Sequence, residues 1–282
     1  MDNKITPSSR TLRIGSLNAC VTEGGTGPPL LLVHGLGGPP TWRLMLEPLM
    51  RHFRVVSVDL PGFGRSDPPE RWYSGDDYAD FLARAAEELD LRDAAVCGVS
   101  WGGQIAAGLA DRIPGRVAAL VLISSSGLRR RTYASAPAVR GLAAWILKRI
   151  ILRSPRTIDL ISRAAYYDIR KRPSDSIALF TEALGREGRR EAFSNALLAA
   201  AAGDPGMELR LSRLRAPVLI LWGENDVVLP KKYAFRFQSA IRDAEVRLFP
   251  GCGHALTLEK PDELVEAMLT FTRKELPCQP AH

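Results

Sequence analysis

Long apolar runs are missing from this sequence of 282 residues. No stretch approaches the roughly 20 consecutive apolar residues that span a bilayer, because Lys and Arg interrupt the longest ones, as in residues 145–152. The first ten residues, MDNKITPSSR, contain no apolar core of a secretory signal. The sequence therefore predicts a soluble protein, and we expect it in the cytoplasm.

Cysteine is also scarce, and the four cysteines do not show the spacing of a metal site. They predict free thiols in a reducing compartment and no bound metal. Phosphate-binding patterns are absent too, since no G-K-[ST] or G-x-G-x-x-G follows a glycine-rich turn. A chain of this length, 46% hydrophobic and 24% charged, can bury its own core without a disulfide or metal to hold it.

What the sequence does have is a net charge of +7. Residues 128–215 contain sixteen Arg and two Lys against four Asp and four Glu, a surplus of +10, so the rest of the chain carries −3. This segment includes the run Arg129-Arg130-Arg131, but no interleaved aromatic residues or known binding motif accompany it. We therefore do not favour a nucleic-acid partner.

Short apolar segments alternate with amphipathic ones, which is typical of a parallel sheet covered on both faces. Strands are predicted at 30–33, 54–58, 94–99, 117–123, 217–222 and 245–249, and helices at 41–52, from 74 to about 89, 101–112, 231–241 and from 261 to about 274. Residues 128–213 break this rhythm with helical stretches only. The sequence thus predicts a core domain of residues 1–127 and 214–282, interrupted by a helical insertion at 128–213.

A serine lies where a predicted buried strand meets a predicted helix, in the pattern Gly98-Val99-Ser100-Trp101-Gly102. A sharp turn at this place exposes the serine hydroxyl, and the flanking glycines let the strand and the helix approach closely. Ser100 is therefore the candidate nucleophile. A serine that only caps the helix is the structural alternative.

A neutral serine needs a base, and His254 is the candidate among the four histidines. It follows the last predicted strand in a Gly-rich loop, and such loops are where α/β proteins place their chemistry. His34 better suits a structural turn, His52 a surface position, and His282 is the last residue. Asp226, after the preceding strand, is the candidate carboxylate that orients His254, with Glu224 as an alternative.

Backbone amides complete the candidate site. His34-Gly35-Leu36-Gly37-Gly38 follows the first buried strand, and glycine-rich backbone there can turn an amide toward the nucleophile. The amides of Leu36 and Trp101 are the candidates for an oxyanion hole, which stabilises the negative charge that develops on the attacked oxygen.

Five landmarks in order along residues 10–275 resemble the α/β-hydrolase family, in its branch with a helical cap. They are His34-Gly35, residues 59–66 (DLPGFGRS), residues 98–103 (GVSWGG), residues 222–226 (WGEND) and Gly253-His254. The resemblance implies an eight-stranded, mostly parallel sheet with the cap inserted after the sixth strand. It also implies a nucleophile–acid–base triad and neither a metal nor an organic cofactor.

The resemblance favours a serine hydrolase of carboxylic esters with a small-molecule acyl substrate. Relatives of this fold that cleave haloalkanes or epoxides carry Asp where this chain has Ser100, so we do not favour those reactions. Hydrolases that cut carbon–carbon bonds of ring-cleavage products often have Trp after the catalytic His, where this chain has Ala255. That activity stays open as an alternative, as do perhydrolysis and a ligand receptor with little turnover.

The basic surplus of the insertion has three interpretations. In residues 137–153, Val139, Leu142, Ile146 and Ile150 recur at helical spacing, beside several Arg and Lys residues. Ala143, Leu147 and Ile151 lie on the flank of this stripe. Packing of this apolar stripe on the core is the simplest interpretation. An entrance that attracts anionic substrates and a helix that contacts an anionic membrane are the alternatives.

Overall fold

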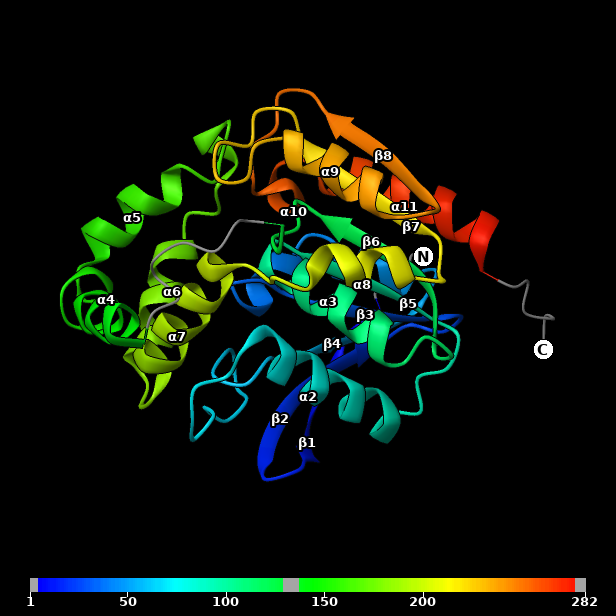
Figure 1. The fold of residues 1–282 in the computed structure, drawn as a ribbon. Coiled ribbons are helices and arrows are strands. Elements are labelled where there is room, and N and C mark those ends of the chain that lie inside the picture. The colour runs from blue at the N-terminus through cyan, green and yellow to red at the C-terminus, as the bar shows by residue number, and fades with distance from the viewer. Residues whose placement is uncertain (1–4, 129–136, 277–282) are drawn as a thin grey trace.

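The computed structural model describes residues 5–128 and 137–276. In it, eight strands form one sheet in the order β1-β2-β4-β3-β5-β6-β7-β8 (Figure 1). The pairs β1–β2 and β2–β4 are antiparallel, and the other five neighbouring pairs are parallel. This arrangement confirms the predicted fold class. The strands are β1 (Ser8–Ile14), β2 (Leu17–Gly24), β3 (Pro29–Val33), β4 (Arg54–Val58), β5 (Ala94–Val99), β6 (Val117–Ile123), β7 (Val218–Gly223) and β8 (Ala244–Phe249).

Helices cover both faces of the sheet (Figure 1). Apolar side chains of α2, α3, α8 and α9 pack on one face, and those of α1, α10 and α11 pack on the other. None of the helices in the described residues has the length and apolar character that a membrane span needs. The helices are α1 (Leu46–Met50), α2 (Gly75–Glu88), α3 (Trp101–Arg112), α4 (Pro137–Arg149), α5 (Pro155–Arg163), α6 (Ser176–Gly185), α7 (Arg189–Ala202), α8 (Met207–Arg213), α9 (Lys232–Ala240), α10 (Leu256–Glu259) and α11 (Pro261–Glu275), with short 3₁₀ helices at Pro39–Trp42, Ile151–Arg153 and Ile169–Lys171.

The central strands are apolar throughout because both of their faces are covered. Every residue of β5 is buried, and successive side chains alternate between the two cores: Val96 packs on the α3 side and Cys97 on the α11 side. In β6, Leu120 and Val121 alternate in the same way. This is the pattern of a parallel sheet between two helical layers.

The prediction of one helix over residues 41–52 is wrong. The structure has a 3₁₀ turn at Pro39–Trp42, followed by the short α1. Proline lacks an amide hydrogen and is tolerated only in the first turn of a helix, so Pro48 limits how far before it α1 can begin. Trp42, the last residue of the 3₁₀ turn, and Met45, directly before α1, are fully buried and secure the segment to the core.

The helical insertion lies between β6 and β7. Helices α4 to α7 project from the carboxyl ends of the strands, on the left in Figure 1, whereas α8 packs beside α3. Arg210 on α8 pairs with Asp76 and Asp204, at 2.7 and 2.9 Å. The run Arg129–Arg131 and the side chains of residues 137–140, Val139 among them, lie outside the described part of the chain.

The prediction that the apolar stripe of α4 packs on the core is wrong. Leu142, Ile146 and Ile150 are exposed to solvent. The helix instead packs beside α7, and it is the flanking residue Leu147 that contacts the core. Helical spacing identifies side chains that share a face, but it does not tell whether that face is turned inward.

Candidate active site

The turn between β5 and α3 holds Ser100 in an unusual backbone conformation, with φ 56° and ψ −121°. Such angles are strained for a residue with a side chain and persist only where the surroundings enforce them. Two glycines make the turn tight. A Cβ atom at Gly98 would lie 2.4 Å from the carbonyl oxygen of Gly102, and a Cβ atom at Gly102 would lie 2.2 Å from that of Val33. Only glycine fits these positions, which leaves Ser100 at the tip of the turn.

The structure brings Ser100, Asp226 and His254 together at the carboxyl ends of three strands. Ser100 follows β5, Asp226 follows β7, and His254 follows β8. Nε2 of His254 lies 2.9 Å from Oγ of Ser100, and its Nδ1 lies 2.7 Å from Oδ2 of Asp226. The Asp226 side chain is fully buried and that of His254 is 13% exposed. An imidazole between a hydroxyl and a buried carboxylate can accept a proton from the hydroxyl while the carboxylate stabilises the resulting charge.

Asp226, rather than Glu224, faces His254. Its second carboxylate oxygen, Oδ1, accepts hydrogen bonds from the amides of Val228 (2.9 Å) and Leu229 (2.7 Å). These bonds fix the carboxylate and leave Oδ2 for the imidazole. Glu224 is partly exposed and its carboxylate lies 3.8 Å from the Lys231 ammonium.

The two backbone segments that carry the amides expected from the sequence, those of Leu36 and Trp101, lie beside Ser100. Trp101 is the first residue of α3, so its N–H has no acceptor within the helix. The loop after β3 lies against this end of α3. A Cβ atom at Gly35 would lie 3.1 Å from Cβ of Ser100 and 3.4 Å from the backbone nitrogen of Trp101. Leu36, the next residue, is half-buried. The structure thus brings the Leu36 segment next to Ser100 and Trp101.

Comparison with known proteins identifies the family of this fold. The family model of the α/β hydrolase fold matches residues 28–261, from β3 to the start of α11. The chain belongs to the α/β-hydrolase-fold family. A solved meta-cleavage product hydrolase of this fold superposes on 94% of the chain, and the chain on 98% of it, with a TM-score of 0.79 and 26% identity.

Curated relatives of this hydrolase-family chain carry different activities in their names. A 2-hydroxymuconate semialdehyde hydrolase of Pseudomonas sp. (strain CF600) is 30% identical over 84% of each chain. A pimeloyl-[acyl-carrier protein] methyl ester esterase of Nitrosospira multiformis is 29% identical over 92% of this chain and all of the esterase. A dihydrolipoyllysine-residue acetyltransferase component of the acetoin cleaving system of Pseudomonas putida is 30% identical over 89% of this chain, which spans only 65% of that longer protein.

His34, the other histidine near the site, has a structural role in this chain. It is fully buried. Its Nδ1 lies 2.7 Å from the carbonyl oxygen of Gly35 and its Nε2 accepts the amide hydrogen of Leu60 at 3.0 Å. The ring is therefore neutral, with its proton on Nδ1. Burial lowers the pKa of His34 from 6.5 to about 4, because the charged imidazolium would lose its hydration.

This low pKa predicts an acid-dependent loss of stability. Between about pH 6.5 and pH 4 the unfolded chain binds a proton at His34 and the folded chain does not, so the stability contributed by neutral His34 falls as the pH falls. The two pKa values correspond to about 3 kcal/mol. Between pH 7 and pH 4, we expect the free energy of unfolding of the wild type to decrease by about 3 kcal/mol more than that of His34→Gln. Urea titrations at several pH values test this, and parallel pH profiles for the two proteins would contradict it.

The helical insertion contacts the candidate site from two sides. On one side, α7 lies against the loop after β4, where the rings of Phe193 and Phe63 are 6.2 Å apart and Phe63 is 6.3 Å from Trp101. On the other, the Ala165 carbonyl accepts the amide hydrogen of Ala255 at 2.8 Å, next to His254. The insertion is therefore fixed to the loops on both sides of Ser100.

A buried carboxylate that the sequence analysis missed links the insertion to the histidine loop. Glu259 on α10 is 2% exposed. Its Oε1 accepts the amide hydrogens of Tyr167 (3.0 Å) and Asp168 (2.9 Å) in the insertion. Its Oε2 accepts the amide hydrogen of Gly253 at 2.9 Å, one residue before His254. The Lys171 ammonium also donates to the Glu259 carbonyl at 2.6 Å. Glu259 thus positions the loop that carries His254 and ties the insertion to it.

Glu259→Gln should destabilise the protein by about 2–3 kcal/mol. The amide of Gln has a single acceptor oxygen, so its NH₂ group would face either the two insertion amides or that of Gly253, and buried donors would stay unpaired. Glu263→Gln is the matched control, because Glu263 is exposed and, within the described residues, its one ion pair is with Lys260 at 2.8 Å. We expect it to change stability by under about 0.5 kcal/mol. Chemical denaturation measures both, and equal stabilities of the two variants would refute this role for Glu259.

The described cysteines do not compete with Ser100 as nucleophiles. Cys20, Cys97 and Cys252 are buried and unpaired. Burial raises the pKa of each thiol, to about 12 for Cys252, so the reactive thiolate is disfavoured. Within residues 5–128 and 137–276, no cluster of His, Cys, Asp and Glu side chains could hold a metal ion.

Proposed function

We propose that this chain is a serine hydrolase that acts on carboxylic esters of small molecules. The observation that supports this most strongly is the continuous hydrogen-bonded arrangement of Asp226, His254 and Ser100, with distances of 2.7 and 2.9 Å. It joins a buried carboxylate, an imidazole and a hydroxyl in the order that nucleophilic acyl transfer requires.

In the proposed mechanism, Nε2 of His254 takes the proton of the Ser100 hydroxyl as Oγ attacks the acyl carbonyl. The tetrahedral intermediate then breaks the bond to the alcohol oxygen, and His254 gives its proton to the leaving alcohol. A water molecule, deprotonated by His254, attacks the acyl-enzyme and releases the carboxylic acid and Ser100. Asp226 keeps the imidazole in the tautomer with hydrogen on Nδ1 and stabilises the imidazolium that forms twice in each cycle.

The amides of Leu36 and Trp101 would hold the negative oxygen of both tetrahedral intermediates. The proximity of Gly35 to Ser100 Cβ and to the Trp101 nitrogen supports this assignment, because it brings the two backbone segments to the same side of the nucleophile. One such donor is worth about 3–4 kcal/mol of transition-state stabilisation. No metal or organic cofactor takes part in this chemistry.

We further propose that residues 128–213 act as a cap and residues 1–127 and 214–282 as the catalytic core. Contacts of the insertion with Phe63 on one side and with the histidine loop on the other support a roof over Ser100. A roof of this kind selects substrates by shape and excludes water during acyl transfer.

Cleavage of carbon–carbon bonds by the same three residues is the second candidate. The 30% identity to a 2-hydroxymuconate semialdehyde hydrolase favours it, whereas Ala255 after His254 departs from the Trp often found in hydrolases of that kind.

A substrate panel separates the two candidates. The panel contains p-nitrophenyl esters of increasing acyl length and one vinylogous diketone acid, and Ser100→Ala gives the background. We expect kcat/KM for at least one ester to exceed the background by about 10⁴-fold or more. Rapid turnover of the diketone acid with inert esters would instead identify a carbon–carbon hydrolase, and covalent labelling without turnover would indicate a receptor.

A further inference from the structure

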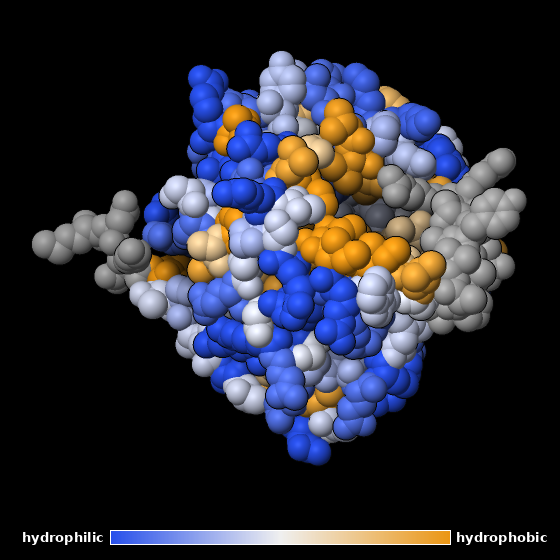
Figure 2. Space-filling view, turned by 90° about the vertical axis from the view of Figure 1, so that its left-hand side faces the viewer, coloured by the Kyte–Doolittle hydropathy of each residue, from blue (hydrophilic) through white to orange (hydrophobic). Residues whose placement is uncertain are grey.

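The outer face of the helical insertion is apolar and exposed. Figure 2 shows apolar side chains gathered on this side of the molecule, with polar ones around them. On α4 the exposed fractions reach 62% for Leu142, 53% for Trp145 and 58% for Ile150. On α5 they reach 69% for Leu160 and 58% for Ile161. Large apolar residues gathered on one surface in this way mark a place of interaction.

Arginines share these helix faces with the apolar residues. On α4, Arg149 follows Leu142 by seven positions and Trp145 by four, so the three lie along one face. On α5, Arg156 precedes Leu160 by one turn in the same way. Arg153 lies in the 3₁₀ turn that joins the two helices. We call this surface, made of Leu142, Trp145, Ile146, Arg149, Ile150, Arg153, Arg156, Leu160 and Ile161, the outer face.

The three arginines of the outer face are exposed, and none forms an ion pair with any residue in the described part of the chain. Residues 141–172 contain eight basic and two acidic residues, a net charge of +6. Both acidic residues are already paired: Asp159 with Arg163 and Arg172, and Asp168 with Arg170. Among the described residues, the three arginines of the outer face therefore carry positive charge that no ion pair neutralises.

We propose that the outer face docks on an anionic lipid surface. Its apolar side chains would enter the boundary between headgroups and acyl chains, while the long arginine side chains reach the lipid phosphates. Trp145 suits this position, because indole rings favour the interface between water and hydrocarbon.

A second copy of this chain fits the outer face poorly. In a two-fold dimer the same patch meets itself, which would bring the unpaired arginines of both copies together without an acidic group to separate them. A surface rich in lipid phosphates supplies the missing negative charge, with about 1 kcal/mol for each Lys or Arg near it.

Vesicle co-sedimentation tests the proposal on the full chain. We expect binding to vesicles of phosphatidylcholine with 30% phosphatidylglycerol, and at least tenfold weaker binding to phosphatidylcholine alone. The variant Arg149→Gln, Arg153→Gln, Arg156→Gln should bind the anionic vesicles about 100-fold more weakly, a tenfold change for each 1.4 kcal/mol. Leu142→Ser with Leu160→Ser should weaken binding to both kinds of vesicle.

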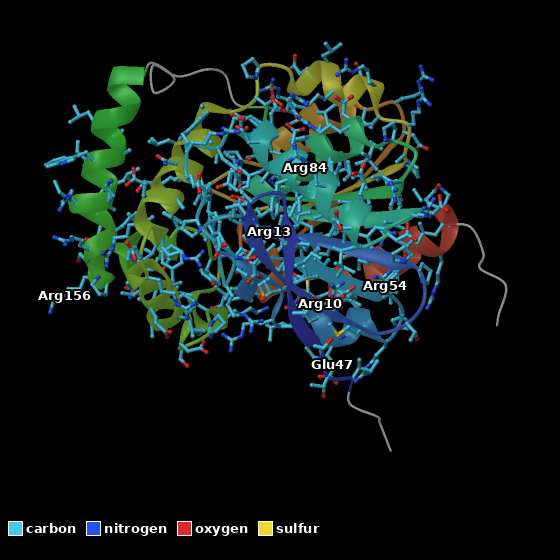
Figure 3. All side chains as sticks on the ribbon, turned by 90° about the horizontal axis from the view of Figure 1, so that it is seen from below. Arg10, Arg13, Glu47, Arg54, Arg84 and Arg156 are labelled. Carbon is cyan, nitrogen blue, oxygen red and sulfur yellow. The ribbon has the colours of Figure 1, made fainter. Side chains whose placement is uncertain are left out.

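A charge-matched control separates the outer face from general attraction of a basic protein. Arg13→Gln, Arg84→Gln, Arg242→Gln removes the same three charges from exposed positions in the core. Figure 3 shows Arg13 and Arg84 well apart from Arg156, which lies at the outer edge of the insertion. We expect this control to bind within about threefold of the wild type. All variants should hydrolyse a small soluble ester at the wild-type rate, which verifies that they are folded.

Fluorescence adds a local readout. Brominated acyl chains should quench the emission of Trp145, and Trp145→Phe should lose this quenching. Three results would overturn the proposal: no binding to anionic vesicles at low salt, equal weakening by the two sets of three Arg→Gln changes, or a dimer in sedimentation velocity that Leu142→Ser with Leu160→Ser dissociates. The last would assign the outer face to a second copy of the chain.

Discussion

Ser100→Ala should lower kcat/KM for ester hydrolysis by about 10⁴- to 10⁶-fold, the range seen when a serine nucleophile is removed from such a site. The substitution deletes the oxygen that lies 2.9 Å from Nε2 of His254. The residual activity would come from the backbone donors and the binding of the substrate. Initial rates at several ester concentrations, corrected for spontaneous hydrolysis, measure the loss.

Ser124→Ala is the matched control for this experiment. Ser124 follows β6, the strand beside β5, and like Ser100 it has a positive φ, 42° against 56°. Its side chain is buried, and its hydroxyl has no hydrogen-bond partner within the described part of the chain. We expect Ser124→Ala to keep activity within about threefold of the wild type, and both variants to unfold within about 1 kcal/mol of it. Activity of Ser100→Ala near that of Ser124→Ala would disprove the assignment of the nucleophile.

Asp226→Asn should lower kcat by about 10⁴-fold at neutral pH, the effect of the equivalent change in a Ser-His-Asp triad. The amides of Val228 and Leu229 donate to Oδ1, so the oxygen of the new Asn would stay there and its NH₂ group would take the place of Oδ2. That group donates to Nδ1 of His254, which moves the ring hydrogen to Nε2. An imidazole in this tautomer cannot take the proton of Ser100.

Glu224→Gln is the control for the carboxylate, because the sequence left Glu224 as an alternative to Asp226. Glu224 lies in the same loop, but it is 37% exposed and its nearest charged partner is Lys231. We expect its kcat within about threefold of the wild type. If Glu224→Gln lost activity and Asp226→Asn kept it, the roles of the two carboxylates would have to be exchanged.

The sequence predicted the elements that are governed by local chemistry. Each strand that packs on both faces, such as β5 and β6, is a continuous apolar run, and the predicted and observed bounds agree closely. The turn that holds Ser100 could be predicted because only glycine fits at positions 98 and 102. Residues 59–66, one of the family landmarks, are also held by local hydrogen bonds: the Asp59 carboxylate accepts the amide hydrogen of Arg65, and the Ser66 hydroxyl donates to the Asp59 carbonyl.

What the sequence did not predict depends on distant partners. In the sequence Glu259 is an ordinary polar residue before the last predicted helix, because the amides that it binds at Tyr167 and Asp168 are about 90 positions away. A charged residue directly after the apolar segment of Leu256 and Leu258, a few positions beyond the candidate base, was the signal available. The outward orientation of the α4 stripe was missed for a similar reason, since the packing of α4 beside α7 determines which flank is turned inward.

The central claim is that Ser100 is a nucleophile activated by His254, and covalent labelling tests it most directly. A p-nitrophenyl alkylphosphonate transfers its phosphonyl group to an activated serine and releases p-nitrophenol. We predict one adduct per chain, located on Ser100 by peptide mass spectrometry, none in Ser100→Ala, and labelling slowed by at least about 10³-fold in His254→Ala. Absence of an adduct, an adduct at another residue, or labelling of His254→Ala at the wild-type rate would contradict the claim.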